Sequence, residues 1–194
     1  MIESLSKRTD YPSLLDYNYL NQASLGLIGS PAVEAMNDFL HNVARHGNLK
    51  MSDEQEINFL NPLKRNIAKL LDTKEEHVAI MGSASEMLGQ LPYIFKPKKN
   101  TKIVAVSTDF PALTRPWISY CKTQLCEMHF VEDDKSTNLT DQIIQAIDKR
   151  TAIVTVSLVQ FSTGTKIDIQ KLTTVTKQAG AKLIIDITQA AGAI

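Results

Sequence analysis

The chain has 194 residues, of which 43% are hydrophobic and 22% are charged, so its size and composition are typical of one globular domain or slightly more. Its 21 Lys and Arg residues balance its 21 Asp and Glu residues, and this neutrality argues against a nucleic-acid or membrane-surface partner. No apolar run is long enough to span a membrane, and the N-terminus lacks the apolar core of a secretory signal, so we expect a cytoplasmic protein.

The N-terminal part of the sequence predicts an irregular arm followed by a helix. Residues 1–16 are polar and irregular, and we divide the chain into an N-terminal segment, 1–30, and a main part, 31–194. Ser30 is predicted as an N-cap and Pro31 as the first helical residue. Apolar residues then recur at helical spacing, which predicts a helix that ends near residue 45.

A second helical region is predicted over residues 52–72. Ser52 and Gln55 have the spacing of a capping box at its start. Pro62 then predicts a kink or a restart, because proline removes a backbone donor and clashes with the preceding turn. We expect the apolar residues after this proline to form a buried face: Leu63, Ile67, Leu70 and Leu71.

From residue 77 onward, short apolar runs alternate with helical patterns. The apolar runs predict strands over residues 77–81, 102–107, 126–131, 151–159 and 182–186. Apolar residues at helical spacing predict helices between them, over residues 84–95, 113–121, 139–147 and 169–179. The strands are continuous rather than alternating apolar runs, which is typical of a sheet covered on both faces. The sequence therefore predicts a three-layer α/β fold with a mostly parallel sheet.

The residues that follow each strand are the candidate site, because ligands bind at the carboxyl ends of the strands in an open parallel sheet. After the first strand, Ser83 and Glu86 have the spacing of a capping box, which is common at helix starts. The same segment, GSASE, also fits an anion site, since small residues let the backbone N–H groups of a helix N-terminus approach a phosphate, and Ser83 or Ser85 adds a hydroxyl donor. The sequence leaves both interpretations open.

The last strand ends in an acid, Asp186, which allows two interpretations as well. With Gln189 it has the spacing of a helix cap. Alternatively, Asp186 pairs with a cationic ring nitrogen, and Gln189 donates to a ring oxygen nearby. Phe110 and Phe161, which follow two other strands, either pack within loops or offer flat faces to an aromatic ligand.

Metal and nucleotide sites are not indicated by the sequence. Cys121 and Cys126 lack ligand spacing, so we expect both to be reduced and structural. The four histidines are scattered and form no ligand cluster. There is no G-x-G-x-x-G motif and no Walker A loop.

A family resemblance is carried by five segments of the sequence: YLNQASLG, GSASEML, VSTDFPALTRPW, VSLVQFSTGT and LIIDITQAAGA. Taken together, and in this order, they resemble the N-terminal part of the class V aminotransferase family of fold type I pyridoxal-phosphate enzymes. That family includes cysteine desulfurases, kynureninases and isopenicillin-epimerase-like proteins. The resemblance runs from about Tyr19 to Ile194, and it implies the large domain of that fold with pyridoxal 5'-phosphate as the cofactor.

The resemblance assigns a role to each matching residue. Ala84 and Ser85 would bind the phosphate, chiefly through backbone N–H groups, and Phe110 would stack on the pyridine ring. Asp186, the predicted catalytic residue, would face the ring nitrogen and keep it protonated, because a nearby opposite charge favours the cation. Gln189 would approach the phenolic oxygen. The protonated ring is the electron sink that stabilises a substrate carbanion.

The resemblance places Ser24 and Phe161 near the substrate, and it also reveals departures from the family pattern. Phe110 stands where cysteine desulfurases usually have a histidine that takes part in proton transfer. Phe161 stands where many relatives have an asparagine. Both departures argue against a cysteine desulfurase.

The Schiff-base lysine of the family and its C-terminal small domain are expected beyond Ile194, since no lysine of this sequence, Lys166 and Lys182 included, has a matching context. We therefore predict the N-terminal part of a pyridoxal-phosphate-dependent transferase or lyase that acts on an amino acid or amine through an external aldimine. The resemblance implies a homodimer, completed by the remaining C-terminal part of the protein. Two alternatives stay open: a non-catalytic remnant or interaction module of the same fold, and an unrelated α/β domain that binds a phosphorylated small molecule.

Overall fold

The structure, a computed structural model, describes residues 7–134 and 137–193. The chain divides into two compact units, Met1–Ala79 and Ile80–Ile194. Within the described ranges, no helix combines the length and the apolar character that crossing a lipid bilayer requires.

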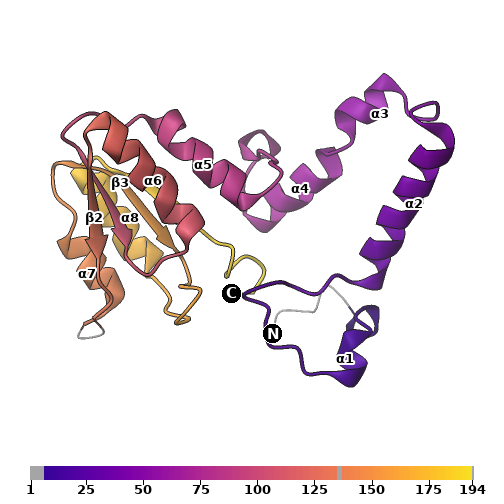
Figure 1. Ribbon diagram of the computed structural model, residues 1–194, viewed down its shortest axis with the longest axis horizontal. Helices are drawn as coiled ribbons and strands as arrows, with labels where there is room; N and C mark the ends of the chain where they lie inside the picture. The colour runs from indigo at the N-terminus through magenta and orange to yellow at the C-terminus, as the bar shows by residue number, and fades with distance from the viewer. Residues whose placement is uncertain (1–6, 135–136, 194) are drawn as a thin grey trace. The chain divides into compact units, whose positions relative to one another are not determined.

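The first unit consists of helices and connecting turns, and its described residues include no strand (Figure 1). Its helices are η1 Arg8–Asp10, α1 Ser13–Asp16, α2 Ser30–His46, α3 Asp53–Asn58, α4 Asn61–Leu70 and η2 Glu75–His77. Helices η1 and α1 lie where the sequence predicts an irregular arm, so that prediction is wrong for these short stretches. Residues 1–6 of the predicted arm lie outside the described residues.

Helix α2 agrees to within one residue at each end with the helix predicted from the sequence. Gly29, rather than Ser30, is the N-cap, and Pro31 lies in the first turn, where the missing N–H costs no helical hydrogen bond. Gly47 follows the last residue of the helix with a φ of +55°, in the left-handed region that favours glycine. Local sequence signals therefore determine both ends of α2.

The second helical region is interrupted at the proline, as predicted. The Ser52 side chain accepts a hydrogen bond from the Gln55 N–H at 3.2 Å, and the Gln55 side chain accepts one from the Ser52 N–H at 2.9 Å, which completes the capping box of α3. Helix α4 then begins at Asn61, with Pro62 in its first turn. The predicted buried face is not observed, because three of its four residues are 46–57% exposed: Leu63, Leu70 and Leu71.

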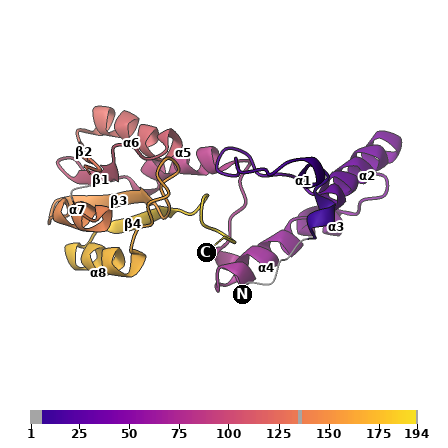
Figure 2. The same cartoon turned by 90° about the horizontal axis from the view of Figure 1, so that it is seen from below.

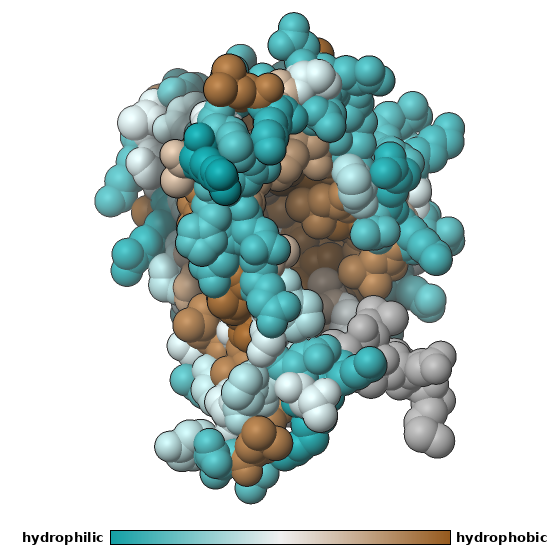
Figure 3. All heavy atoms as spheres, turned by 90° about the vertical axis from the view of Figure 1, so that its right-hand side faces the viewer, coloured by the Kyte–Doolittle hydropathy of each residue, from teal (hydrophilic) through white to brown (hydrophobic). Residues whose placement is uncertain are grey.

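Exposure of apolar side chains extends to α2, which contains no buried residue. The space-filling view shows hydrophobic residues interspersed among hydrophilic ones at the surface (Figure 3). An amphipathic pattern identifies a face that can be buried, but the burial itself requires a second packed layer. The exposed apolar residues of α2 are Val33, Met36, Phe39, Leu40 and Val43.

The second unit is a parallel α/β structure, which confirms the predicted fold class. Its strands are β1 Lys102–Val106, β2 Glu127–Val131, β3 Thr151–Ser157 and β4 Lys182–Asp186. They form one sheet in the order β2-β1-β3-β4, and each neighbouring pair is parallel. The helices of the unit are α5 Ala84–Phe95, α6 Pro111–Gln124, α7 Leu139–Gln145 and α8 Ile169–Ala179.

The strand predicted over residues 77–81 is not observed. His77 ends η2, and the next residue, Val78, has an extended backbone, with φ −105° and ψ 118°. No residue from Val78 to Met81 pairs with another strand among the described residues. An apolar run becomes a strand only where a neighbouring strand accepts its backbone hydrogen bonds, and the run itself does not supply that neighbour.

The sheet lies between two helical layers (Figure 2). On one face, Ile103 and Ile153 pack against α5 and α6 through Leu88, Leu91, Leu113, Trp117 and Cys121. On the other face, alternate residues of β1 and β3 pack against α7 and α8 through Leu139, Ile143 and Leu172. Both faces of the central strands β1 and β3 are therefore buried, which explains their continuous apolar sequence.

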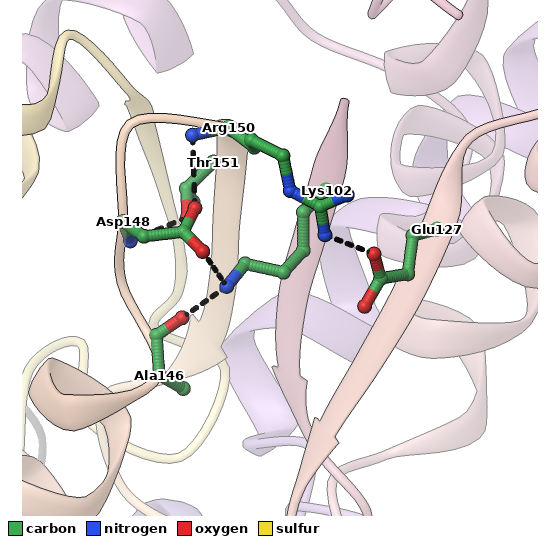
Figure 4. A network of polar contacts seen from close by, with 6 residues as sticks. All are labelled: Lys102, Glu127, Ala146, Asp148, Arg150 and Thr151. Atoms are coloured by element: carbon green, nitrogen blue, oxygen red, sulfur yellow. Dashed lines mark hydrogen bonds and ion pairs between the residues drawn. The ribbon is translucent and has the colours of Figure 1, made fainter. Parts of the chain in front are cut away.

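At the amino ends of the strands, a polar network surrounds the buried side chain of Lys102 (Figure 4). The Lys102 Nζ donates to Asp148 Oδ2 at 2.8 Å and to the Ala146 carbonyl at 2.7 Å. The hydrogen bond from Lys102 lowers the pKa of Asp148 to about 2. Arg150, just before β3, pairs with Glu127 at the start of β2. The network thus joins the starts of β1, β2 and β3, at the end of the sheet opposite to the carboxyl ends.

Candidate functional site

The carboxyl ends of β1 and β3 form the topological switch point of the sheet. These two strands are neighbours, but β1 is followed by α6 on one face and β3 by α8 on the other. The chain therefore leaves the two strands in opposite directions. Open α/β sheets bind their ligands at such a point, so the residues after β1 and β3 form the centre of the candidate site.

Asp109, in the loop after β1, is only 4% exposed, and its carboxylate accepts four hydrogen bonds. Ser157 donates two of them, from its N–H to Oδ2 at 2.8 Å and from its hydroxyl to Oδ1 at 2.6 Å. The Gln160 side chain donates to Oδ2 at 3.1 Å, and the Phe110 N–H donates to Oδ1 at 2.7 Å. A buried carboxylate is costly unless its lone pairs are satisfied, and here donors from two loops satisfy them.

The Gln160 side chain is also buried, at 2% exposed, and its orientation follows from its partners. Its Nε2 donates to Asp109 Oδ2 and to the Ser157 carbonyl at 3.3 Å, and both of these groups are acceptors. Its Oε1 is buried and has no hydrogen-bond partner among the described residues. The bonds to Asp109 and Ser157 therefore hold Gln160 in place although one of its polar atoms stays unsatisfied.

The structure brings Phe110 and Phe161 together. Their ring centroids lie 5.4 Å apart with an angle of 83° between the ring planes, an edge-to-face arrangement that aromatic pairs favour. Phe110 is the N-cap residue of α6, and Phe161 lies in the turn after β3 that the Gln160 N–H closes by donating to the Thr165 carbonyl. Phe110 is 46% exposed and Phe161 is 40% exposed, so both rings keep surface that a ligand can contact.

Asp186 ends β4 and lies opposite Ser157 in the register of β3 and β4. Its Oδ1 accepts hydrogen bonds from the Thr188 N–H at 2.8 Å and from the Thr188 hydroxyl at 2.5 Å. Turns rather than a helix follow β4 among the described residues, so the predicted helix cap is not formed. Asp186 is partly buried, and the side-chain hydrogen bonds that the structure shows for it are made at Oδ1.

At the start of α5, the cap of the helix differs from the predicted capping box. The Ser83 side chain accepts from the Glu86 N–H at 3.1 Å, as expected. The Glu86 carboxylate accepts from the Gly82 N–H at 2.9 Å rather than from Ser83, and a Cβ at Gly82 would lie 2.8 Å from this carboxylate. The N–H groups of Ala84 and Ser85 have no acceptor within the helix and bond to none of the described residues outside it.

The predicted site residues are divided between the two units. Ser24 belongs to the first unit, where it is exposed and donates its N–H to the Asn21 carbonyl at 3.1 Å. The others belong to the second unit, where the start of α5 and the chain after β4 lie on the same side (Figures 1 and 2). They are Ala84, Ser85, Phe110, Phe161, Asp186 and Gln189.

Reasoning from the sequence missed the network of Asp109, Ser157 and Gln160 that lies beneath the two phenylalanines. One signal was present: each of these residues is polar and lies at or just after the end of an apolar strand. The sequence does not show that they meet, because Asp109 and Ser157 are 48 residues apart and belong to different strand ends.

The described residues contain no group of His, Cys, Asp and Glu side chains that could hold a metal ion. Cys121 and Cys126 are free thiols, as predicted. Burial raises the pKa of Cys121 to about 11.

The groups of the candidate site fit a phosphorylated aromatic ligand that contains a ring nitrogen. Ala84 and Ser85 offer N–H donors to an anion at a helix N-terminus. Phe110 offers a partly exposed ring, and Asp186 offers the acceptor Oδ2. Pyridoxal phosphate combines a phosphate, an aromatic ring and a basic ring nitrogen, so the donors and acceptors present here match its chemistry.

Comparison with known proteins gives one family match and several relatives. The family model described as Aminotransferase class-V matches residues 18–194. The chain is 22% identical over 191 residues to a probable cysteine desulfurase of Pyrococcus abyssi, covering 95% of this chain and 47% of the relative. It is 27% identical over 205 residues to a kynureninase of Candida albicans, covering 96% of this chain and 44% of the relative.

A solved structure supports the same fold. It is a mutant of C-DES with glycine covalently linked to the pyridoxal-phosphate cofactor, which superposes with a TM-score of 0.87 at 15% identity. The match covers 97% of this chain and 51% of that protein. The chain thus spans about half the length of the relatives that it matches.

Proposed function

The chain belongs to the aminotransferase class-V family, and from this membership we propose that its full-length protein is a pyridoxal-phosphate enzyme that acts on an amino acid or amine. One observation carries the proposal: a partly exposed aromatic ring, Phe110, and a strand-end carboxylate, Asp186, lie at the carboxyl edge of one parallel sheet. Ser157 links them, because it pairs with Asp186 across the strands and donates to Asp109, next to Phe110.

In this proposal, Asp186 holds a proton on the ring nitrogen of the cofactor. Thr188 occupies Oδ1 and fixes the orientation of the carboxylate, so that Oδ2 is the acceptor for the N–H of the ring. A carboxylate in contact with this nitrogen favours its protonated form. When bound, pyridoxal phosphate supplies an electron sink that stabilises negative charge on the substrate carbon.

The remaining residues bind and orient. The N–H groups of Ala84 and Ser85 bind the phosphate at the start of α5, where the helix dipole adds a favourable field. Phe110 stacks on the ring, and Gln189 contacts the phenolic oxygen. Phe161 lies near the substrate in this proposal, and its ring is in edge-to-face contact with Phe110.

Two further assignments complete the proposal. Ser24 contacts the substrate, and the side chain that moves protons on the substrate is a residue other than Phe110, because a phenylalanine has no titratable group.

We also propose a cytoplasmic homodimer. The exposed apolar residues of α2 recur at helical spacing and support a further packing partner, since the apolar face of an amphipathic helix is normally buried against another element.

The experiment is a titration of the purified full-length protein with pyridoxal phosphate, followed by visible absorbance and equilibrium dialysis. We expect saturable binding with a shifted absorbance band, and we expect Asp186→Ala to weaken binding about tenfold and to alter the band. The matched control is Asp38→Ala, which removes an exposed carboxylate from α2 that makes no ion pair with the described residues.

If the wild-type protein shows neither saturable binding nor a shifted absorbance band, the proposed enzyme activity is contradicted and a non-catalytic remnant of the fold is favoured. If dialysis shows that pyridoxal phosphate binds but its absorbance band does not shift, a domain that binds another phosphorylated molecule is favoured. Normal turnover by Asp186→Ala would remove Asp186 from the mechanism while leaving the cofactor in place.

A further inference from the structure

We propose that Asp109 is a positioning residue that holds Phe110 and Phe161 in their edge-to-face arrangement and thereby preorganises the surface against which the cofactor ring lies. The part of this inference that concerns the cofactor rests on the proposed function. The part that concerns the two aromatic residues rests only on the contacts of Asp109.

The first step is that one carboxylate joins two loops. The loop after β1 contains Asp109 and Phe110. Ser157 is the last residue of β3, and the chain after it leads through Gln160 to Phe161. Asp109 accepts hydrogen bonds from its own loop, through the Phe110 N–H, and from the chain at the end of β3, through Ser157 and Gln160. Each phenylalanine is directly adjacent in the chain to a residue of this network.

The second step is that this connection lies at the switch point, where the sheet itself does not hold the loops together. The ladder between β1 and β3 runs from Lys102–Thr151 to Ala105–Thr155, so backbone pairing of the two strands ends before Asp109 and Ser157 are reached. Beyond this point the helices that follow lie on opposite faces. The Asp109 carboxylate and the contact between the two rings therefore carry the connection between the loops.

The third step is that the network requires a carboxylate. All four of its partners are donors, and an ionised carboxylate has acceptor lone pairs for each of them. An asparagine replaces one of the two oxygens with an NH2 group. At the Oδ2 position this group would face the Ser157 N–H and the Gln160 Nε2, and at the Oδ1 position it would face the Phe110 N–H and the Ser157 hydroxyl. The unsatisfied Gln160 Oε1 allows a partial repair, because a flip of the Gln160 amide would let Oε1 accept from an NH2 group at the Oδ2 position. In either orientation one backbone N–H, that of Ser157 or that of Phe110, would lose its acceptor.

The test measures hydrogen–deuterium exchange of the full-length protein without added cofactor, in wild type, Asp109→Asn and Ser157→Ala. We expect peptides that cover residues 107–112 and 157–164 to exchange faster together in Asp109→Asn, and to a smaller extent in Ser157→Ala. The control is Asp148→Asn, which removes a hydrogen-bonded carboxylate at the opposite end of the same sheet and should leave both segments at the wild-type rate.

A second measurement addresses the cofactor. If Asp109 positions the ring surface, Asp109→Asn should raise the Kd for pyridoxal phosphate about tenfold, which corresponds to roughly 1.4 kcal/mol, whereas Asp148→Asn should not change it. Both variants remove a carboxylate that accepts a hydrogen bond from another strand. A general loss of stability would therefore raise the Kd of both variants, and it does not explain a change in Asp109→Asn alone.

The outcomes separate the inference from the proposed function. If either segment of Asp109→Asn exchanges at the wild-type rate, the inference is overturned, whatever the protein binds. Coupled exchange with an unchanged Kd would overturn the role of Asp109 toward the cofactor. A wild-type protein that binds no pyridoxal phosphate would overturn the proposed function, and the exchange data would still decide whether Asp109 holds the two loops. Because Ser157→Ala keeps the carboxylate, it provides the exchange test if Asp109→Asn fails to fold.

Discussion

Asp109 and Ser157 lie 48 residues apart in the sequence, and two short hydrogen bonds join them, at 2.8 Å from the Ser157 N–H and at 2.6 Å from its hydroxyl. Asp109 is 4% exposed and Ser157 is 5% exposed, so both bonds form away from solvent. This pair connects the ends of two adjacent strands at the point where the chain diverges to opposite faces of the sheet. Its strength can be measured independently of any cofactor.

Removal of the Ser157 hydroxyl should destabilise the protein. Ser157→Ala removes one donor from the buried Asp109 carboxylate, and loss of a buried hydrogen bond to a charged group costs about 1–3 kcal/mol. Urea unfolding of the two proteins gives the difference in free energy of unfolding. Thr174→Ala is the matched control, because it removes an exposed hydroxyl that bonds to the Gln170 carbonyl of the same helix and should change stability by less than about 0.5 kcal/mol. If the two substitutions lower the free energy of unfolding equally, the hydrogen bond to Asp109 contributes no more to stability than an exposed one.

The contact between Phe110 and Phe161 should appear as a coupling energy. Edge-to-face pairs contribute about 0.5–1.5 kcal/mol beyond the area they bury, and the partial exposure of both rings favours the lower end of this range. A double-mutant cycle with Phe110→Leu, Phe161→Leu and the double variant measures this energy from unfolding curves. Strict additivity of the two single effects would mean that the rings do not interact in solution.

The acid limb of the stability curve should depend on Asp148. The hydrogen bond from Lys102 lowers the folded-state pKa of Asp148 from 3.8 to about 2. A lowered pKa means that the folded state binds the proton less tightly than the unfolded state does. The stabilisation is therefore fully present above about pH 4 and is lost as the pH falls toward 2.

Melting temperatures measured across this window should fall more steeply for wild type than for Asp148→Asn. Asp38→Asn, which removes an exposed carboxylate without an ion pair to the described residues, should keep the wild-type slope. Parallel curves for wild type and Asp148→Asn would contradict the role of the pair with Lys102.

The two thiols should differ in reactivity. Burial raises the pKa of Cys121 to about 11, and this side chain is 7% exposed, so its thiolate is scarce and poorly accessible near neutral pH. Cys126 is more exposed and lies between α6 and β2. Iodoacetamide applied to the native protein should therefore modify Cys126 before Cys121, as measured by peptide mass spectrometry. Both should react at similar rates after denaturation, and equal labelling of the native protein would contradict the burial of Cys121.

Local sequence signals determined much of the fold. Continuous apolar runs separated by helical patterns identified four strands and the helices that cover them, because a strand buried on both faces has no polar side. The capping box of Ser52 and Gln55 and the restart at Pro62 were also predicted, since caps and proline act on residues next to them in the chain. The family resemblance, carried by motifs in order along the chain, is confirmed by the family match. The assigned site roles stay predictions.

The tertiary structure decided what depends on partners that are distant in the sequence. The apolar run at 77–81 does not form a strand, because pairing requires a neighbour and not only a pattern. The acid at the end of β4 does not cap a helix, because turns follow the strand among the described residues, and its Oδ1 accepts hydrogen bonds from Thr188. Asp109, Ser157 and Gln160 form one hydrogen-bonded network beneath two phenylalanines because β1 and β3 are neighbours in the sheet. Spacing along the chain carries no information about which strands are neighbours, because a hydrogen bond depends on distance in space.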